Sequence, residues 1–142
     1  MRMRSIHVSL AAGALLLTAC APARSGSPSV THENGAVVLT GAALTDGPGS
    51  LLATMSGKVP NFHVHRIRGE CPEITLRNVG NLRGVVNPHV YVDGTRATDT
   101  CVLESLRTND VERVEVYPQG YTTRAGYGRH ASGLILVFMR SS

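Results

Sequence analysis

Lysine and long apolar segments are both scarce in this chain of 142 residues. Lys58 is the only lysine, and removing the positive charges of Arg2 and Arg4 from the formal charge of +4 leaves about +2. That excess is too small for the basic surface of a nucleic-acid-binding domain. The apolar run at residues 10–17 has about half of the ~20 residues that a membrane-spanning helix needs.

Catalytic motifs are also missing. The sequence contains no G-x-S-x-G, no H-E-x-x-H and no phosphate-binding glycine loop. Glu70, Glu73 and Glu104 show no spacing that suggests a pair of catalytic carboxylates. We therefore predict that the protein is not an enzyme and has no cofactor.

The N-terminus combines basic residues, a short apolar run and a small-residue cleavage site, which are the parts of a secretory signal. The run ends in Leu17-Thr18-Ala19-Cys20, and this tetrapeptide resembles the lipobox of bacterial lipoproteins. The resemblance implies that the signal is cut before Cys20 and that acyl chains, palmitate among them, are attached to this cysteine. The alternatives, a buried helix or a transmembrane anchor, fit the short run and its basic start less well.

A lipid anchor would determine where the protein is located. One acyl chain holds a protein weakly and several hold it firmly, so a lipidated Cys20 implies a stable contact with the membrane. Ala21 follows the cysteine, a choice that favours the outer membrane in many diderm bacteria. We expect an outer-membrane, lipid-anchored protein that faces the periplasm.

Composition divides the chain into three parts. Residues 1–19 are the predicted signal, and the remainder has the size of one ordinary domain. Proline, serine and glycine are frequent in residues 21–36, which is typical of a flexible tether. We therefore assign residues 20–43 to the lipidated cysteine and its tether, and residues 44–142 to the folded domain. Residues 36–40 can form a short strand.

Two cysteines remain besides Cys20. Cys71 and Cys101 are an even pair in an oxidising compartment, so we expect a disulfide. The competing interpretation, a metal-binding or redox pair, lacks the C-x-x-C spacing. A closed loop of about 31 residues would stabilise the fold by roughly 3–4 kcal/mol in the chain-entropy model.

Apolar periodicity predicts two short helices. The first begins after Ser50 or Asp46, carries apolar residues on one face and ends at Gly57. The second begins after Asp99 or Thr100 and carries apolar residues between positions 102 and 106.

Alternating patterns predict strands at residues 61–66, 74–79, 89–92 and 113–117. Residues 118–133 are interrupted by glycine and proline and form a long turn, and the wholly apolar residues 134–138 suit a central strand covered on both faces. The predicted fold class is α/β of the α+β type, a small mixed β-sheet with two short helices packed on it.

Several of these segments, in this order, resemble the plug domain of TonB-dependent outer-membrane receptors. They are LLATMSGKVPNFHV at 51–64, VYVDG at 90–94, DVERVEVY at 110–117 and YGRHASGLI at 127–135. The similarity covers residues 44–139 and implies a plug-like fold. The motif residues are expected to be structural: Gly57, Pro60, Asp93, Gly94, Glu112, Glu115, Tyr127, Gly128 and Gly133.

Simple physical roles account for these motifs. Asp93-Gly94 lets a strand reverse with a positive φ on glycine. Glu112 and Glu115 are expected to keep the exposed side of an edge or half-buried strand charged. Gly128 and Gly133 suit a tight loop before the last strand.

The sequence also departs from the family. Asn61 stands where the family has glycine, and we find no convincing TonB-contact box. Receptor plugs lie inside a barrel of roughly twenty-two strands in the same chain, whereas this sequence ends at Ser142, directly after the last plug strand. We expect the plug fold without a barrel or transport pathway in this polypeptide.

Two groups of residues are candidates for binding. His63 and His65 lie two apart on a predicted strand, about 7 Å apart, and could offer two metal ligands, with His89 or Asp93 as a third. Solvated histidines on an exposed strand face are the alternative, and no metal site is predicted.

The second group is a loop rich in tyrosine and arginine, in which Tyr121, Arg124 and Arg129 are the candidates for binding a partner. Its alternative is a solvated turn whose tyrosines cover the sheet edge. Truncation of Tyr121 and Arg124 is expected to leave folding intact and to weaken partner binding.

The predicted function is non-enzymatic binding or assembly at the outer membrane. The partners would be the membrane, through the lipid, and an outer-membrane barrel or another envelope protein. The alternative is an envelope lipoprotein that captures a small ligand or metal, such as a siderophore, haem or Zn²⁺.

Overall fold

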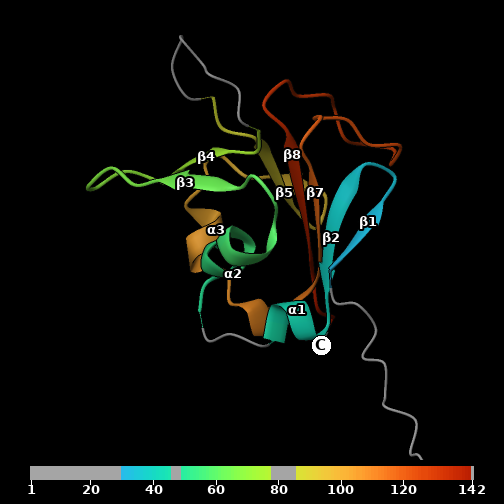
Figure 1. Ribbon diagram of the computed structural model, residues 1–142, viewed down its shortest axis with the longest axis horizontal. Coiled ribbons are helices and arrows are strands. Elements are labelled where there is room, and N and C mark those ends of the chain that lie inside the picture. Colours follow the sequence, from blue (N-terminus) through green and yellow to red (C-terminus); the bar gives the residue numbers. More distant parts are fainter. Residues whose placement is uncertain (1–29, 46–48, 78–85, 142) are drawn as a thin grey trace, which may run out of the picture.

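The computed structural model describes residues 30–45, 49–77 and 86–141, which build a six-stranded mixed sheet with short helices beside it (Figure 1). The strands lie in the order β1-β2-β7-β8-β5-β6; β5 and β8 are parallel, and all other neighbours are antiparallel. Their bounds are Val30–Glu33 (β1), Ala36–Thr40 (β2), His89–Val92 (β5), Thr95–Arg96 (β6), Val111–Tyr117 (β7) and Leu134–Met139 (β8). The predicted fold class is confirmed.

The remaining elements are short. The two-stranded sheet of β3 and β4 comprises His63–His65 and Glu73–Thr75. The helices are α1 (Ala42–Thr45), α2 (Leu51–Lys58), α3 (Val102–Ser105) and the 3₁₀ turn η1 (Thr108–Asp110). In Figure 1 the helices lie on one side of the six-stranded sheet, with the β3–β4 hairpin projecting beyond them.

Apolar side chains cover both faces of the sheet. Along β8, Ile135 and Val137 pack toward the helices, whereas Leu134 and Leu136 belong to a second cluster on the opposite face. All four are almost completely buried. Residues 134–138 are wholly apolar for the predicted reason, which is that β8 is a central strand covered on both faces. Successive side chains of a strand point to opposite faces, so both sets are buried.

Helix α2 begins and packs as the sequence predicts. The Ser50 side chain caps it by accepting a hydrogen bond from the backbone N–H of Ala53 at 3.4 Å, and Leu51 and Leu52 are buried. The end differs from the prediction, because Gly57 lies inside the last turn and the helix continues to Lys58. The chain reverses at Asn61 instead, where φ is 57°. Asparagine tolerates this left-handed conformation, which explains why it can stand in the family's glycine position.

The sheet starts earlier than the predicted domain boundary at residue 44. β1 and β2 form a hairpin, and β2 pairs with β7 inside the sheet. The turn between them is Asn34-Gly35, with φ of 49° and 80°. Asn-Gly is the strongest short-range signal for a two-residue hairpin. Composition assigned these residues to the tether, although the Asn34-Gly35 dipeptide before the predicted strand at residues 36–40 indicated a hairpin.

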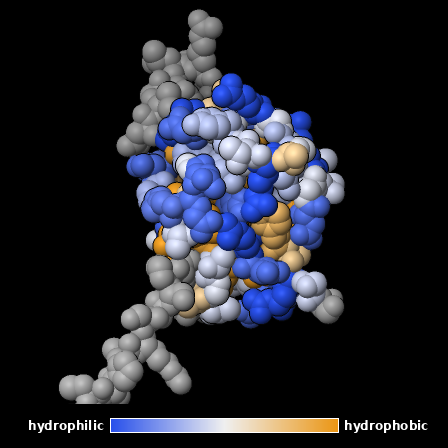
Figure 2. Space-filling view, turned by 90° about the vertical axis from the view of Figure 1, so that its right-hand side faces the viewer, coloured by the Kyte–Doolittle hydropathy of each residue, from blue (hydrophilic) through white to orange (hydrophobic). Residues whose placement is uncertain are grey.

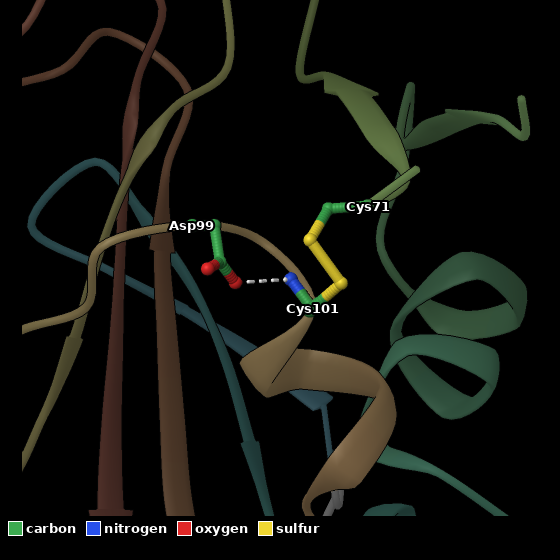
Figure 3. A group of neighbouring side chains, drawn as sticks. All are labelled: Cys71, Asp99 and Cys101. Atoms are coloured by element: carbon green, nitrogen blue, oxygen red, sulfur yellow. Dashed lines mark hydrogen bonds between the residues drawn. A yellow bond between two sulfur atoms is a disulfide. The ribbon is translucent and has the colours of Figure 1, made fainter. Parts of the chain in front are cut away.

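Cys71 and Cys101 form the predicted disulfide, with their Cα atoms 4.8 Å apart (Figure 3). The bond links the approach to β4 with the start of α3. Asp99 accepts a hydrogen bond from the backbone N–H of Cys101 at 3.0 Å. The N-cap of α3 is Cys101, without a side-chain cap, and not Asp99 or Thr100 as predicted. Over the described residues, no helix is long and apolar enough to cross a membrane. The predicted signal and the lipidation site Cys20 lie outside the described residues.

Candidate functional site

The segment from Pro118 to Gly133, here called the Tyr/Arg loop, contains no helix or strand and connects β7 to β8. It crosses the sheet face opposite the helices, where Tyr127 packs against the second apolar cluster. The Tyr127 and Tyr91 rings meet edge to face at 5.0 Å between centroids. The loop therefore rests on the sheet.

A buried carboxylate anchors this loop. Glu115 on β7 is only 1% exposed and accepts hydrogen bonds from three side chains. Arg124 of the loop donates from Nε at 2.8 Å and from Nη2 at 2.6 Å. Arg113 Nε and the Tyr117 hydroxyl donate at 2.6 and 2.8 Å. Arg113 also reaches Glu33 of β1 at 2.8 Å. One carboxylate thus ties the central strand to the loop.

The charge of Glu115 is stabilised where it is buried. Burial by itself would raise the pKa of Glu115, but the hydrogen bonds from Arg124, Tyr117 and Arg113 outweigh it and hold that pKa below its ordinary value. Burial raises the pKa of Tyr117, which therefore keeps its proton and donates. Glu115 is an ionised anchor for the loop.

This arrangement corrects the prediction for Glu115. The residue does not keep an exposed strand face charged, because β7 lies inside the sheet and the loop covers that face. Glu112 is exposed, as predicted, at an irregularity in the β7–β8 register. Alternation with Val114 and Val116 placed Glu115 on the solvated face. The strand pattern could not show that a loop folds back over that face.

Arg124, predicted as a partner-binding residue, also has a structural contact that the sequence did not indicate. Its guanidinium binds Glu115 and lies 5.2 Å from the centre of the Phe138 ring. Removing it would leave a buried charge with fewer partners, so truncation of Arg124 affects folding. Arg124 nevertheless stays exposed, as do the other two candidates, Tyr121 and Arg129. Tyr121 is 50% exposed, and the Arg129 guanidinium lies 5.3 Å from its ring centre.

Two further contacts hold the ends of the loop. The Arg77 guanidinium donates to the Ala131 carbonyl and to Gln119 at 3.3 Å. The backbone N–H of His130 donates to the Gly120 carbonyl at 2.9 Å. A Cβ at Gly120 would lie 1.7 Å from the His130 carbonyl oxygen. Gly120 therefore permits a close approach that the sequence prediction did not identify.

The Asp93-Gly94 turn joins β5 to β6 with φ of 46° and 82°. The Asp93 carboxylate also accepts a hydrogen bond from the backbone N–H of Met139 at 2.9 Å, a second role that the motif did not indicate. Gly133 has φ of 110° and lies against Leu76 and the Tyr117 carbonyl. Gly128 has neither a positive φ nor a close neighbour, so its backbone does not require glycine.

Pro60 follows the end of α2 and is exposed, where it prevents the helix from continuing.

His63 and His65 are both exposed on β3, outside the six-stranded sheet. Within the described ranges, the one group of three metal-ligating side chains is Cys71, Asp99 and Cys101, whose sulfurs form the disulfide. The fold brings no third ligand from the described residues to His63 and His65.

The surface beside β1 is mostly hydrophilic (Figure 2). Glu33 and Arg113 pair on this side of the sheet, where the Asn34-Gly35 turn also lies. A cavity of about 220 Å³ lies between that turn and the Tyr/Arg loop, and Arg113 and Arg124 line it. Polar side chains therefore line the junction of β1 with the loop.

The fold and the loop together define a class: a small α+β domain whose prominent surface is a long loop anchored across a mixed sheet. The family model for the TonB-dependent Receptor Plug Domain matches residues 30–133, and the chain belongs to this family. The match begins at the first residue of β1, as the sheet does. No curated protein matches the chain.

Solved structures show the same fold. Two structures of the RagAB peptide importer, in the closed-closed and open-open states, superpose with a TM-score of 0.58 at 20% and 19% identity. A structure of the RagAB peptide transporter gives 0.53 at 19% identity. Each comparison covers 78% of this chain but only 12–13% of the other. The chain therefore spans about an eighth of these relatives, and the likeness concerns the fold.

Proposed function

We propose that this protein is a non-enzymatic binding or assembly module of the outer membrane, held there by lipid on Cys20 and facing the periplasm. Its partner would be an outer-membrane barrel or another envelope protein. Membership of the plug-domain family supports this role, because plug domains associate with outer-membrane barrels. The Cys20 anchor rests on the sequence resemblance at residues 17–20.

One observation carries the proposal: the Tyr/Arg loop is held firmly while part of it remains exposed. Glu115, Arg77 and the β8 face hold the loop from below. Tyr121 and Arg129 stand at its accessible side. Tyrosine and arginine are enriched among residues that dominate binding energy, and a pre-ordered loop loses little conformational entropy on binding.

Crosslinking in the native envelope, followed by affinity purification and mass spectrometry, tests the proposal. The full-length chain should capture a specific outer-membrane barrel or envelope protein. The Tyr121→Ala/Arg129→Ala variant should lose most of that capture, because these side chains would contribute contacts without supporting the fold. Arg68→Ala is the matched control, since it removes an exposed arginine from the distant β3–β4 hairpin.

The outcomes separate clearly. Equal capture by the wild type and by the Tyr121→Ala/Arg129→Ala variant would exclude the loop as the binding surface. A preparation without any specific partner would contradict the assembly role. A Cys20→Ser variant should move from the membrane to the soluble periplasmic fraction, and its retention in the membrane would contradict lipid anchoring.

A further inference from the structure

A second site lies apart from the exposed side of the Tyr/Arg loop. A cavity of about 300 Å³ opens where β5 and β6 meet the connection to α3. His89, Arg96 and Asp99 line it, together with His130, which the Tyr/Arg loop brings to its wall. The Cys71 sulfur of the disulfide lies at its margin. Separate chain segments therefore contribute polar side chains to one hollow.

The two histidines of this cavity are stacked. The ring centroids of His89 and His130 are 3.6 Å apart, and the rings are inclined by 23°. They come from segments far apart in the sequence, so only the fold brings them together. Gly120 supports the arrangement, because its carbonyl accepts the His130 N–H and its lack of a side chain leaves room for the His130 carbonyl. The His130 Nδ1 atom is buried and has no partner among the described residues.

Arg96 faces this pair. Its Nη2 atom lies 2.7 Å from His89 Nε2. A guanidinium only donates, so His89 accepts at Nε2 and is neutral in this state. Arginine normally pairs with carboxylates, yet no described acidic residue lies within ion-pair distance of Arg96. The nearby Asp99 carboxylate is engaged by the Cys101 N–H and the Thr98 hydroxyl at 3.0 and 3.1 Å.

We propose that this cavity binds a small oxyanion, a carboxylate or phosphate group, through the Arg96 guanidinium with the His89–His130 pair beside it. The guanidinium fork can hold two oxygens of such a group at once. A cavity of about 300 Å³ is at the lower end of small-molecule sites, which suits a compact ligand or the charged end of a longer one.

Binding should take up a proton. Burial, and then the positive charges of His130 and Arg96, lower the pKa of His89. An anion in the cavity would offset those charges and favour the protonated form of His89. The groups facing His89 are Arg96 from β6, His130 from the loop and Tyr91 from its own strand, with Asp99 on the cavity wall. The anion should therefore bind more tightly as the pH falls.

The full-length chain in detergent tests this by NMR, with the histidine ring resonances as the readout. Titration with sodium acetate and, separately, with inorganic phosphate should shift the signals of His89 and His130 in a saturable manner. The two titrations distinguish a carboxylate from a phosphate site by their relative affinities. Acetate affinity should rise several-fold between pH 8 and pH 6, a range in which acetate itself stays ionised.

Arg96→Gln removes the proposed anion contact from an exposed side chain and should weaken binding about tenfold or more. Arg68→Gln makes the same change of charge on the distant hairpin and should leave the affinity unaltered. His89→Gln should abolish the pH dependence while some binding remains, because His89 is the group that takes up the proton. The proposal is overturned if neither anion gives a saturable shift, if both arginine variants weaken binding equally, or if acetate affinity is the same at both pH values.

Discussion

At the scale of single residues, left-handed backbone positions decide where the chain turns. Asn34-Gly35 and Asp93-Gly94 each place two successive residues at positive φ, and both dipeptides are visible in the sequence. Gly120 is different, because its requirement comes from a neighbour ten residues away. A local pattern can reveal the first kind of glycine but cannot reveal the second.

Gly120→Ala should therefore destabilise the protein more than a glycine substitution at a comparable φ in open space. Gly126 provides that control, since its φ is 93° and an added Cβ would have no neighbour within 4 Å. Both variants bear the strain of a left-handed alanine, about 1–2 kcal/mol. Gly120→Ala should cost roughly a further 1–3 kcal/mol, because the added methyl group meets the His130 carbonyl.

Urea unfolding followed by circular dichroism gives both free energies. Equal losses for Gly120→Ala and Gly126→Ala would show that the close approach at His130 is absent in solution. A larger loss of unfolding free energy for Gly120→Ala than for Gly126→Ala would support the close approach.

At the scale of elements, covalent and ionic links join parts that share few backbone hydrogen bonds. The disulfide connects the β4 side of the molecule to α3, and the ion pair of Arg66 with Glu104 spans the same region. Glu115 connects β7 to the Tyr/Arg loop. The cysteine pair could be inferred from number and compartment, whereas the Glu115 anchor needed the fold.

Reduction of Cys71–Cys101 should lower the free energy of unfolding by roughly 3 kcal/mol, since the bond limits the freedom of the unfolded chain. Urea midpoints measured with and without dithiothreitol check this prediction. The Cys71→Ser/Cys101→Ser variant is the control and should unfold at the same midpoint in both conditions. An unchanged midpoint for the reduced wild-type protein would contradict a stabilising role.

At the scale of the whole molecule, one sheet separates two apolar clusters. Among the residues that the structure describes, Glu115 is the one buried charged residue, and it lies on the side of the second cluster. The helices lie on one side of the sheet (Figure 1). The Tyr/Arg loop contacts the other face through Tyr127 and Arg124. The stability of the second face therefore depends on the ionisation of Glu115 as well as on apolar burial.

Acid should weaken this second face. The pKa of Glu115 is lower in the folded protein than in the unfolded chain, so its contribution is complete above the ordinary value of 4.5 and is lost as the pH falls through the folded value. The free energy of unfolding should decline below about pH 4.5. Glu115→Gln should be less stable at neutral pH and should lose less stability on acidification through this range.

Unfolding measurements at a series of pH values give the slope of the unfolding free energy against pH for the wild type and for Glu115→Gln. Parallel slopes for the wild type and Glu115→Gln would show that other carboxylates, such as Glu33, dominate acid unfolding. Glu33→Gln is the matched comparison, because it removes the exposed partner of Arg113 and leaves the buried one.

Features that depend on neighbours in the chain could be predicted from the order of the amino acids. Capping at Ser50, the Asp93-Gly94 reversal and the apolar β8 segment are local, and the structure has each of them. The order of the family motifs was enough to predict the α+β fold, which the plug-domain match confirms.

Which polar groups meet was settled by the three-dimensional arrangement of the chain. Glu115 and Arg124 lie nine residues apart, Arg113 and Glu33 eighty apart, and His89 stacks on a residue of another segment. No periodicity encodes such contacts, because they depend on how the β7–β8 loop folds back over the sheet and on which strands lie side by side. Because that loop covers the sheet face, Glu115 is buried although it was predicted to be solvated. Its charge is stable there because three side chains donate hydrogen bonds to it.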